Sequence, residues 1–315
     1  MSEKMKDKNA YYLSRAFFSS IGMSLIFTNC LTSFWISEIL GIIISVIILY
    51  FIRPNNTKIL KIIVGFLMSL IAMIILVNMG HTLYLNETPI FVLSLLPVMA
   101  VYILSKCEKK AFNKIGAIFF VCSVVLFALK ILGLSPHFMV DNLKPYGLVG
   151  IKEIILGTLI FVSISITPII YLDESNNRHE LIKNYLISAF TTLVVSVLAM
   201  GVLGLKEVIL YRNPEYIVLK KISLLDFVNN VDSFFNFAIL LDLLFTSSIG
   251  IRAVSTKTRE SNIILCMLLL IGTSIATRNN DIVVFIYYNL PYIFIVLLII
   301  QLFLSIIKYK FLKKL

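Results

Sequence analysis

The chain has 315 residues, of which 59% are hydrophobic, and its formal net charge is +11. A soluble domain this apolar would aggregate, so the composition excludes a water-soluble enzyme or binding domain. A helix needs about 20 consecutive apolar residues to cross a bilayer, and the chain supplies such stretches repeatedly. The sequence therefore predicts an all-α integral membrane protein.

Ten apolar stretches follow one another along the chain, separated by short polar segments. They cover residues 11–28, 34–52, 60–80, 89–105, 115–134, 154–172, 183–205, 224–251, 262–278 and 282–307. We expect one transmembrane domain over residues 1–315, with halves at about 11–134 and 154–307. A cytoplasmic N-terminal segment (1–10) and a C-terminal tail (308–315) flank it, and no cleavable signal fits the start.

Basic residues gather in every second gap between the stretches. Only eight of the 28 Lys and Arg residues fall on the side opposite the N-terminus. Because Lys and Arg near span ends favour the cytoplasm, this bias predicts that both termini are cytoplasmic. The positive charge then indicates anionic lipid headgroups as partners, and not nucleic acid.

Small and hydroxyl residues interrupt two of the apolar stretches. They are Ser19, Ser20 and Gly22 in the first stretch, and Ser163, Ser165 and Thr167 in the sixth. Many transporters pair two five-helix halves, and their helices one and six unwind to hold a substrate at the bilayer midplane. Such residues also line ordinary helix contacts in lipid, so packing stays an alternative.

The eighth stretch carries polar residues at helical spacing. They are Asp226, Asn229, Asn230, Ser233 and Asn236. Because charged and amide groups in a span normally face a cavity or a partner, the stripe is expected to point inward. Asp226 also fits a helix cap. We expect Asp232 to contribute to a ligand or cation site with Asn229, Asn230 and Ser233.

Three acidic residues in or near the spans, Asp232, Asp242 and Glu38, have several interpretations. Asp232 and Asp242 find no Lys or Arg deep in a span, because Arg15 and Lys130 both sit near span ends. Both acids are therefore expected to be protonated, hydrated or cation-bound, and Asp242 to make a separate interhelical hydrogen bond. Glu38 is expected to reach the headgroups or to meet a partner subunit.

Three collinear motifs carry a family resemblance. The fourth stretch opens with Glu87, Thr88 and Pro89. The approach to the sixth contains Asp141, Asn142, Pro145, Gly150 and Gly157. The loop before the eighth leads through Pro214 and Ile222 to Asp226 and Phe227. Together these segments resemble the spore germination permease family, the B subunits of Ger-type germinant receptors.

The resemblance implies a fold, a function and partners. The family is similar to amino acid–polyamine–organocation transporters, which implies a LeuT-like inverted repeat of five plus five helices. It implies a subunit of the spore inner membrane that binds a small germinant, an amino acid, and signals to A- and C-type receptor subunits. The chain departs from the family pattern at Thr167-Pro168, where Gly-Glu is common, and at Asn230, where Arg is common.

Other functions stay open or are disfavoured. A secondary transporter of amino acids or related solutes, coupled to protons or sodium, is one alternative, and a structural subunit without ligand binding is another. We expect no enzyme, cofactor or metal, because no H-E-x-x-H, G-x-S-x-G or P-loop motif occurs. Asp232 and Asp242 would lie about 15 Å apart on one helix, too far for a catalytic carboxylate pair.

Overall fold

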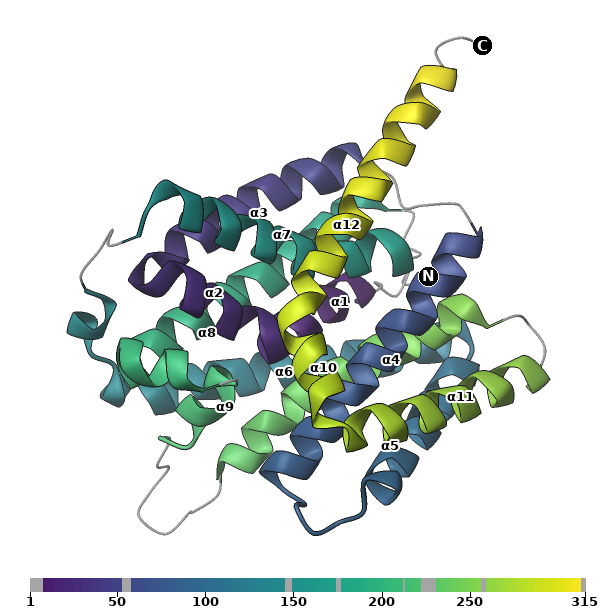
Figure 1. Ribbon diagram of the computed structural model, residues 1–315, viewed down its shortest axis with the longest axis horizontal. Coiled ribbons are helices and arrows are strands. Elements are labelled where there is room, and N and C mark those ends of the chain that lie inside the picture. Colours follow the sequence, from purple (N-terminus) through teal and green to yellow (C-terminus); the bar gives the residue numbers. More distant parts are fainter. Residues whose placement is uncertain are drawn as a thin grey trace, which may run out of the picture.

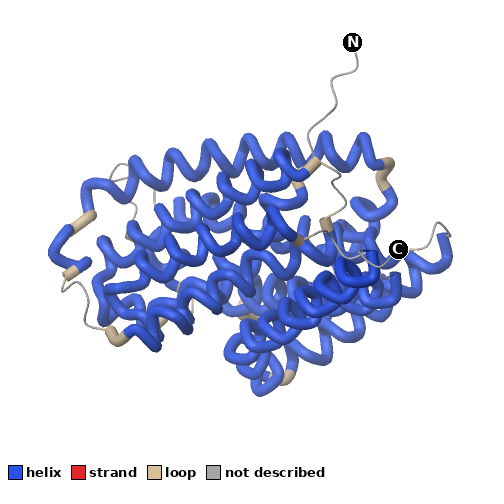
Figure 2. The backbone as a smooth tube through the Cα atoms, turned by 90° about the horizontal axis from the view of Figure 1, so that it is seen from above, coloured by secondary structure: helices blue, strands red, loops and turns tan. Residues whose placement is uncertain are grey.

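The computed structural model describes residues 8–52, 58–144, 149–173, 177–211, 213–221, 231–255 and 259–312. Every regular element within these ranges is a helix (Figure 2). Helices suit a hydrocarbon environment because each satisfies its own backbone N–H and C=O groups without water. The predicted all-α class is confirmed.

The elements of the first half run from α1 to α6. They are α1 (Asn9–Phe17), the π-helical turn η1 (Phe18–Gly22), α2 (Met23–Cys30), the 3-10 turn η2 (Leu31–Ser33), α3 (Phe34–Phe51), α4 (Lys58–Leu83), α5 (Ile90–Lys106) and α6 (Lys109–Leu134). Two short 3-10 turns, η3 (Ser135–His137) and η4 (Val140–Leu143), follow α6.

The second half runs from α7 to α12. Its elements are α7 (Ile151–Leu172), α8 (Arg178–Leu210), the short α9 (Pro214–Leu219), α10 (Val231–Val254), α11 (Arg259–Arg278) and α12 (Asn280–Leu312). Figure 1 shows α12 crossing the bundle and extending beyond it at the C-terminal end.

Eight helical stretches in the described residues are long and apolar enough to cross a membrane, and α5 is a shorter apolar helix of 17 residues. The first stretch spans 43 residues and contains a turn at Leu31, whose φ is 49°. Large apolar side chains face outward, among them Ile43 on α3, Leu96 on α5 and Phe303 on α12. Lipid is the natural partner of such a surface, so the chain is a multi-span helical membrane protein by its architecture. The count of ten spans stays a prediction.

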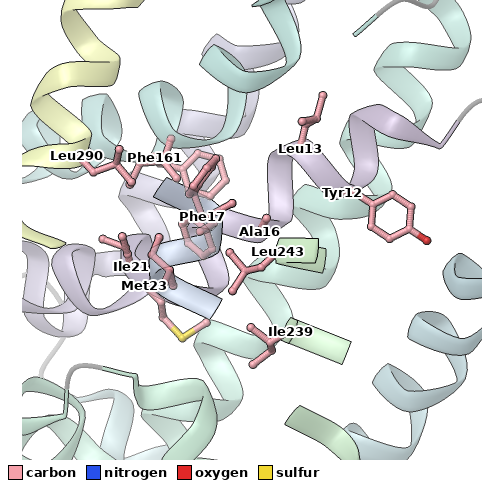
Figure 3. Packing of buried hydrophobic residues seen from close by; sticks show 14 of the residues in the cluster. Tyr12, Leu13, Ala16, Phe17, Ile21, Met23, Phe161, Ile239, Leu243 and Leu290 are labelled. Atoms are coloured by element: carbon pink, nitrogen blue, oxygen red, sulfur yellow. The ribbon is translucent and has the colours of Figure 1, made fainter. Parts of the chain in front are cut away.

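The centre of the bundle is formed by α7 and by the α1 segment that packs on it. α7 contacts α1, η1, α2, α3, α4 and α12, and its residues from Ile160 to Leu172 are buried. Figure 3 shows Phe161 of α7 and Leu243 of α10 beside Ala16 and Phe17 of α1. This packing holds α1 between the two helices, α7 and α10, that the sequence places in the second half.

A close approach of two backbones fixes α10 against α4. The Ser69 hydroxyl of α4 donates to the Ser247 carbonyl of α10 at 3.0 Å and to the Gly65 carbonyl at 2.7 Å. A Cβ atom on Gly250 would lie 2.6 Å from the Gly65 carbonyl oxygen, so only glycine fits there. Small residues drive helix association in lipid because they let backbones touch. α10 is thereby held in a defined position.

α8 is interrupted near its C-terminal end by Gly204. Its backbone has φ 75° and ψ 165°, a conformation that only glycine adopts without strain. One turn earlier, the Gly201 carbonyl accepts bonds from the Asn142 side chain at 2.8 Å and from the Met139 N–H at 3.0 Å. The kink lies in the last part of α8, and the next helix, α9, packs on α8.

We expect Gly204→Ala to lower the free energy of unfolding by about 1–3 kcal/mol, because alanine is strained at this backbone conformation. The measurement is loss of helical circular dichroism on heating the purified protein in mild detergent. Gly80→Ala is the control, because its Cβ would meet no atom within 4 Å. The control should be neutral or raise stability by up to about 1 kcal/mol. Equal stability of the two variants would contradict the assigned kink.

Candidate functional site

Four charged side chains from four different helices meet inside the bundle. They are Arg15 on α1, Lys130 on α6, Glu215 on α9 and Asp242 on α10, and none is more than 2% exposed. We call these four residues the charge network. Two cations and two anions make the network formally neutral, which is how buried charges are tolerated in a low-dielectric interior.

Arg15 is the hub of the network. Its Nε lies 3.0 Å from Asp242 Oδ2 and its second guanidinium nitrogen lies 3.6 Å from Glu215 Oε1. Its remaining terminal nitrogen donates to the Tyr11 hydroxyl at 2.8 Å. Lys130 completes the arrangement, because its Nζ donates to the same Glu215 oxygen at 2.7 Å. One guanidinium therefore connects α1 with both α9 and α10.

The network keeps unused hydrogen-bonding capacity. Arg15 Nε is close to Asp242 but its N–H is not directed along a hydrogen bond, and neither Asp242 oxygen has a partner of good geometry. Glu215 Oε2 also lacks one. Buried acceptors without partners are unusual in proteins and often mark a functional site or a bound water. Chemically, the arrangement offers acceptors for an ammonium group and a guanidinium for a carboxylate.

The network corrects the expectation about Asp242. Asp242 was predicted to have no basic partner within a span, yet Arg15 pairs with it and Lys130 pairs with Glu215. The prediction failed because both basic residues sit near span ends in the sequence, where Lys and Arg usually reach the interface. Here α1 packs against α7, α8 and α10, so the Arg15 side chain is directed into the bundle.

Glu215 was not identified from the sequence because it lies between two predicted spans. The apolar residues that follow Glu215 in the sequence nevertheless indicated a buried segment. Pro214 starts a short helix in which the residues from Tyr216 to Leu219 are apolar. Five of its six residues are buried, and Ile217 is the exception. An apolar hexapeptide in a presumed loop indicates a segment that folds back into the protein. α9 does so and carries Glu215 to the network.

The predicted break of the first span takes the form of a π-helical turn. η1 covers Phe18–Gly22 and so contains Ser19, Ser20 and Gly22, all buried. The Ser20 hydroxyl donates to the Ala16 carbonyl at 2.8 Å, and Ser19 lies against the Glu215 carboxylate. A π-turn is a local irregularity that is frequent at functional sites, and here the chain stays helical through it. Ser19 is the predicted residue that the structure brings to the charge network.

The predicted break of the sixth span does not occur. α7 is continuous from Ile151 to Leu172, although it contains Pro168. Ser163 donates to the Ile160 carbonyl at 3.0 Å, Ser165 to Phe161 at 2.7 Å, and Thr167 to Phe294 of α12 at 3.2 Å. Because these hydroxyls bond carbonyls of α7 and α12, they support packing and leave no unwound segment.

The first and sixth spans nevertheless touch at the predicted place. η1 contacts α7, and a Cβ atom on Gly22 would lie 3.2 Å from the Ile164 side chain. The Phe18 and Phe161 rings meet edge to face, with centroids 5.0 Å apart. Apolar side chains thus separate the small residues of the two helices. The predicted substrate role of these residues stays a prediction.

The predicted residues of the eighth span fall at the edge of the described structure. Asn229 and Asn230 lie outside the described residues, as does Asp226. α10 begins at Val231, and the side chains of Asp232 and Ser233 also lie outside the described part. Their expected role in a ligand or cation site stays a prediction.

Glu38 differs from its expected position. It was expected to reach the headgroups or a partner subunit, but it is fully buried within the chain. Its carboxyl lies against the Ser196 hydroxyl of α8. Glu38 is on α3, and α8 packs against α3 and covers its side chain.

The hollows found in the described residues do not coincide with the network. A hollow of about 380 Å³ is lined by Ser135, Phe138 and four apolar residues of α8 between Leu193 and Leu198, and its wall is almost wholly apolar. Such a surface suits lipid or an apolar side chain better than a charged solute. Within the described residues, no three His, Cys, Asp or Glu side chains are grouped closely enough to hold a metal ion.

Comparison with models of known protein families finds no match for this chain. A search of curated proteins finds no significant match either.

We expect Asp242→Asn to destabilise the protein by about 3–5 kcal/mol, because it leaves the buried Arg15 charge without its closest partner. The double variant Arg15→Met with Asp242→Asn removes one cation and one anion. It should be less destabilised than the sum of the two single variants, with a coupling of about 0.5–3 kcal/mol. Thermal unfolding in detergent, followed by circular dichroism, gives both values.

Asp141→Asn is the matched control for this experiment. Asp141 pairs with Lys144 at 2.9 Å, but the two side chains are 88% and 56% exposed. Exposed pairs contribute about 0–1 kcal/mol, so this variant should unfold nearly as the unaltered protein does. The charge network would lose its assigned role in stability if Asp242→Asn behaved like the control.

Proposed function

We propose that this protein is the membrane subunit of a spore germinant receptor, and that it binds a small germinant with both an ammonium and a carboxylate group, such as an amino acid. The observation that carries the proposal is the charge network beside the π-turn η1. The sequence motifs supply the receptor class, and the network supplies a chemistry suited to a zwitterion.

The network is suited to an exchange of partners. An amino acid carboxylate would replace Asp242 beside Arg15, and its ammonium group would replace Lys130 beside Glu215. Such an exchange preserves neutrality, which a buried site requires. Because the four residues come from α1, α6, α9 and α10, the exchange would alter how four elements are tied together. The ligand would thus favour a second arrangement of the bundle and transmit it to A- and C-type subunits.

The proposal includes ten spans with a LeuT-like inverted repeat. Two observations support the count. A continuous helix of 43 residues would be about 65 Å long, twice the hydrocarbon thickness, and the turn at Leu31 divides it into two parts that pack on each other. α5 is an apolar helix of 17 residues, which is at the lower limit of length for a span. Contact of α1 with α7 supports the pairing of the repeats.

A secondary transporter of amino acids, coupled to protons or sodium, is the second candidate. It is favoured by the π-turn η1 between α1 and α2, since irregular backbone in a transporter helix is where substrate and coupling ions are bound. A structural subunit without a ligand is the third, favoured by the internal pairing of all four charges. Uptake of labelled amino acids into proteoliposomes separates the transporter, because a receptor subunit would show binding without uptake.

We expect a zwitterionic amino acid from a screening panel to raise the melting temperature of the purified protein. Binding at a hundredfold excess over the dissociation constant adds about 2.7 kcal/mol of stability. Glu215→Gln should weaken this ligand at least about tenfold, equal to about 1.4 kcal/mol, because the ammonium group loses its counter-charge. Each variant is compared with its own ligand-free form.

Glu108→Gln is the control for ligand binding, since Glu108 is exposed between α5 and α6. It should keep the full shift. An unchanged ligand response in Glu215→Gln would exclude the network as the binding site, and a panel without any stabilising solute would favour the structural subunit.

The proposed orientation places both termini in the cytoplasm and the α8–α9 connection outside. We expect a single cysteine at Tyr211, on a background without the native cysteines, to react with a membrane-impermeant maleimide added to intact cells. Tyr211 is partly exposed at the end of α8. A cysteine replacing Lys109, at the start of α6, is the control and should react only after the membrane is opened. The reverse pattern would overturn the orientation.

A further inference from the structure

A second polar zone lies between α3 and α8, away from the charge network. Along α8, polar side chains recur every four residues at Asn184, Ser188, Thr192 and Ser196, and each is at most 4% exposed. Residues four apart follow one ridge of a helix, so they form a row about 18 Å long. α3 packs against α8 and contributes Glu38 and Ser45. We call these six residues the polar seam.

Much of the polar seam has unmet hydrogen-bonding capacity. Both Glu38 oxygens and the hydroxyls of Ser45, Ser188 and Ser196 are buried and make no hydrogen bond of good geometry in the described structure. The groups are nevertheless close together, since Glu38 lies against Ser196, and Tyr185 lies against Ser45. Buried polar groups in proteins are normally satisfied, and bound water is the usual partner of those that the protein itself leaves unsatisfied.

Glu38 has no counter-charge among the described residues. Its carboxyl forms no ion pair there. The titratable group that interacts with Glu38 from a packed helix is Cys30 of α2, which also interacts with the exposed Glu153 of α7. Tyr185 of α8 lies against Ser45, further along the polar seam. Arg178 reaches α3 at its other end, where it donates to the Tyr50 carbonyl at 3.1 Å. An uncompensated carboxylate is costly in an apolar interior, whereas a protonated carboxyl is neutral and donates a hydrogen bond.

A metal cation is a poorer occupant than a proton. Hard cations in proteins need several converging oxygen ligands. Beside Glu38, the Ser37 hydroxyl is already engaged, because it donates to the Ile154 carbonyl at 3.1 Å and contacts Cys30 Sγ at 3.2 Å. Ser196 is the hydroxyl that remains next to the carboxyl. One carboxyl and one hydroxyl suit a proton.

The far end of the polar seam leads toward the surface. Asn184 begins the row and accepts a hydrogen bond at 2.9 Å from Lys8, which is partly exposed. The row therefore joins the buried carboxyl near the start of α3 to the end of the bundle where the described chain begins. Hydroxyls and intervening water in such a row can pass a proton from one oxygen to the next.

We propose that Glu38 is a proton-binding site within the membrane domain, and that the polar seam is its proton pathway to the Lys8–Asn184 end. The proton adds to one Glu38 oxygen and leaves by transfer to water and hydroxyl groups along α8, so no other reactant is needed. The site does not depend on the proposed ligand, because its residues are separate from the charge network.

Infrared spectroscopy of the purified full chain in lipid tests the binding site without any solute. We expect a carbonyl stretching band of a protonated carboxylic acid at neutral pH, and we expect Glu38→Gln to abolish that component. Glu153→Gln is the control, since Glu153 is an exposed acid on the neighbouring α7, and it should keep the band. Retention of the full band in Glu38→Gln, or its loss on adding sodium at constant pH, would overturn the proposal.

Two further variants keep the test decisive if Glu38→Gln fails to fold. Ser196→Ala retains the acid but removes the hydroxyl that lies against it, so the same band should shift to higher frequency, because the carboxyl loses a polar neighbour. Ser188→Ala interrupts the row, so the Glu38 band should respond more slowly to a pH jump on the Lys8 side. An unshifted band in Ser196→Ala would overturn the site, and an unchanged response in Ser188→Ala would overturn the pathway.

Discussion

The ion pair between Arg15 and Asp242 is the interaction on which the centre of this bundle depends. A charge at the centre of a membrane helix costs about 2.5–3.5 kcal/mol on insertion scales, so neither residue is tolerated there alone. In their 3.0 Å contact, Arg15 of α1 and Asp242 of α10 neutralise each other's charge, so each helix supplies the counter-charge that the other needs. Glu215 of α9 lies near Arg15 and also pairs with Lys130 of α6, so α9 and α6 are joined to the same group of balanced charges. Lateral packing in lipid lacks the hydrophobic drive of a soluble core, so these four charges help to specify which helices meet.

The positions of the helices follow closely from hydropathy. The sixth stretch was expected at 154–172 and is found at Ile151–Leu172, and the ninth was expected at 262–278 and is found at Arg259–Arg278. Hydropathy predicts these positions because an apolar segment in lipid must satisfy its backbone hydrogen bonds internally, which a helix does. The serines and the glycine of the first span mark a local irregularity, although the chain stays helical there as the π-turn η1 and does not unwind.

The direction of individual side chains could not be obtained in the same way. Arg15 and Lys130 were not expected to pair with acids inside the spans because both sit near span ends, and Glu38 was expected to reach the headgroups or a partner subunit. Each is buried because another helix covers it, which depends on tertiary contacts that one sequence does not encode locally. Glu215 was missed because a loop between spans was assumed to stay outside, although its apolar neighbours indicated otherwise. The charge network and the polar seam thus arise from packing. The network balances its charges, whereas the seam holds a single acid, Glu38, that has no basic partner among the residues that the structure describes.

The kink at Gly204 interrupts a helix that is longer than the membrane is thick. Thirty-three residues of straight α-helix would measure about 50 Å, whereas the hydrocarbon core is about 30 Å thick. An over-long span usually tilts or thickens the bilayer around it. Here Gly204 interrupts the helix six residues before its last residue, Leu210. The surplus becomes an arm that returns α9 to the interior, so the excess length of one span supplies the acid that a neighbouring pair of basic residues requires.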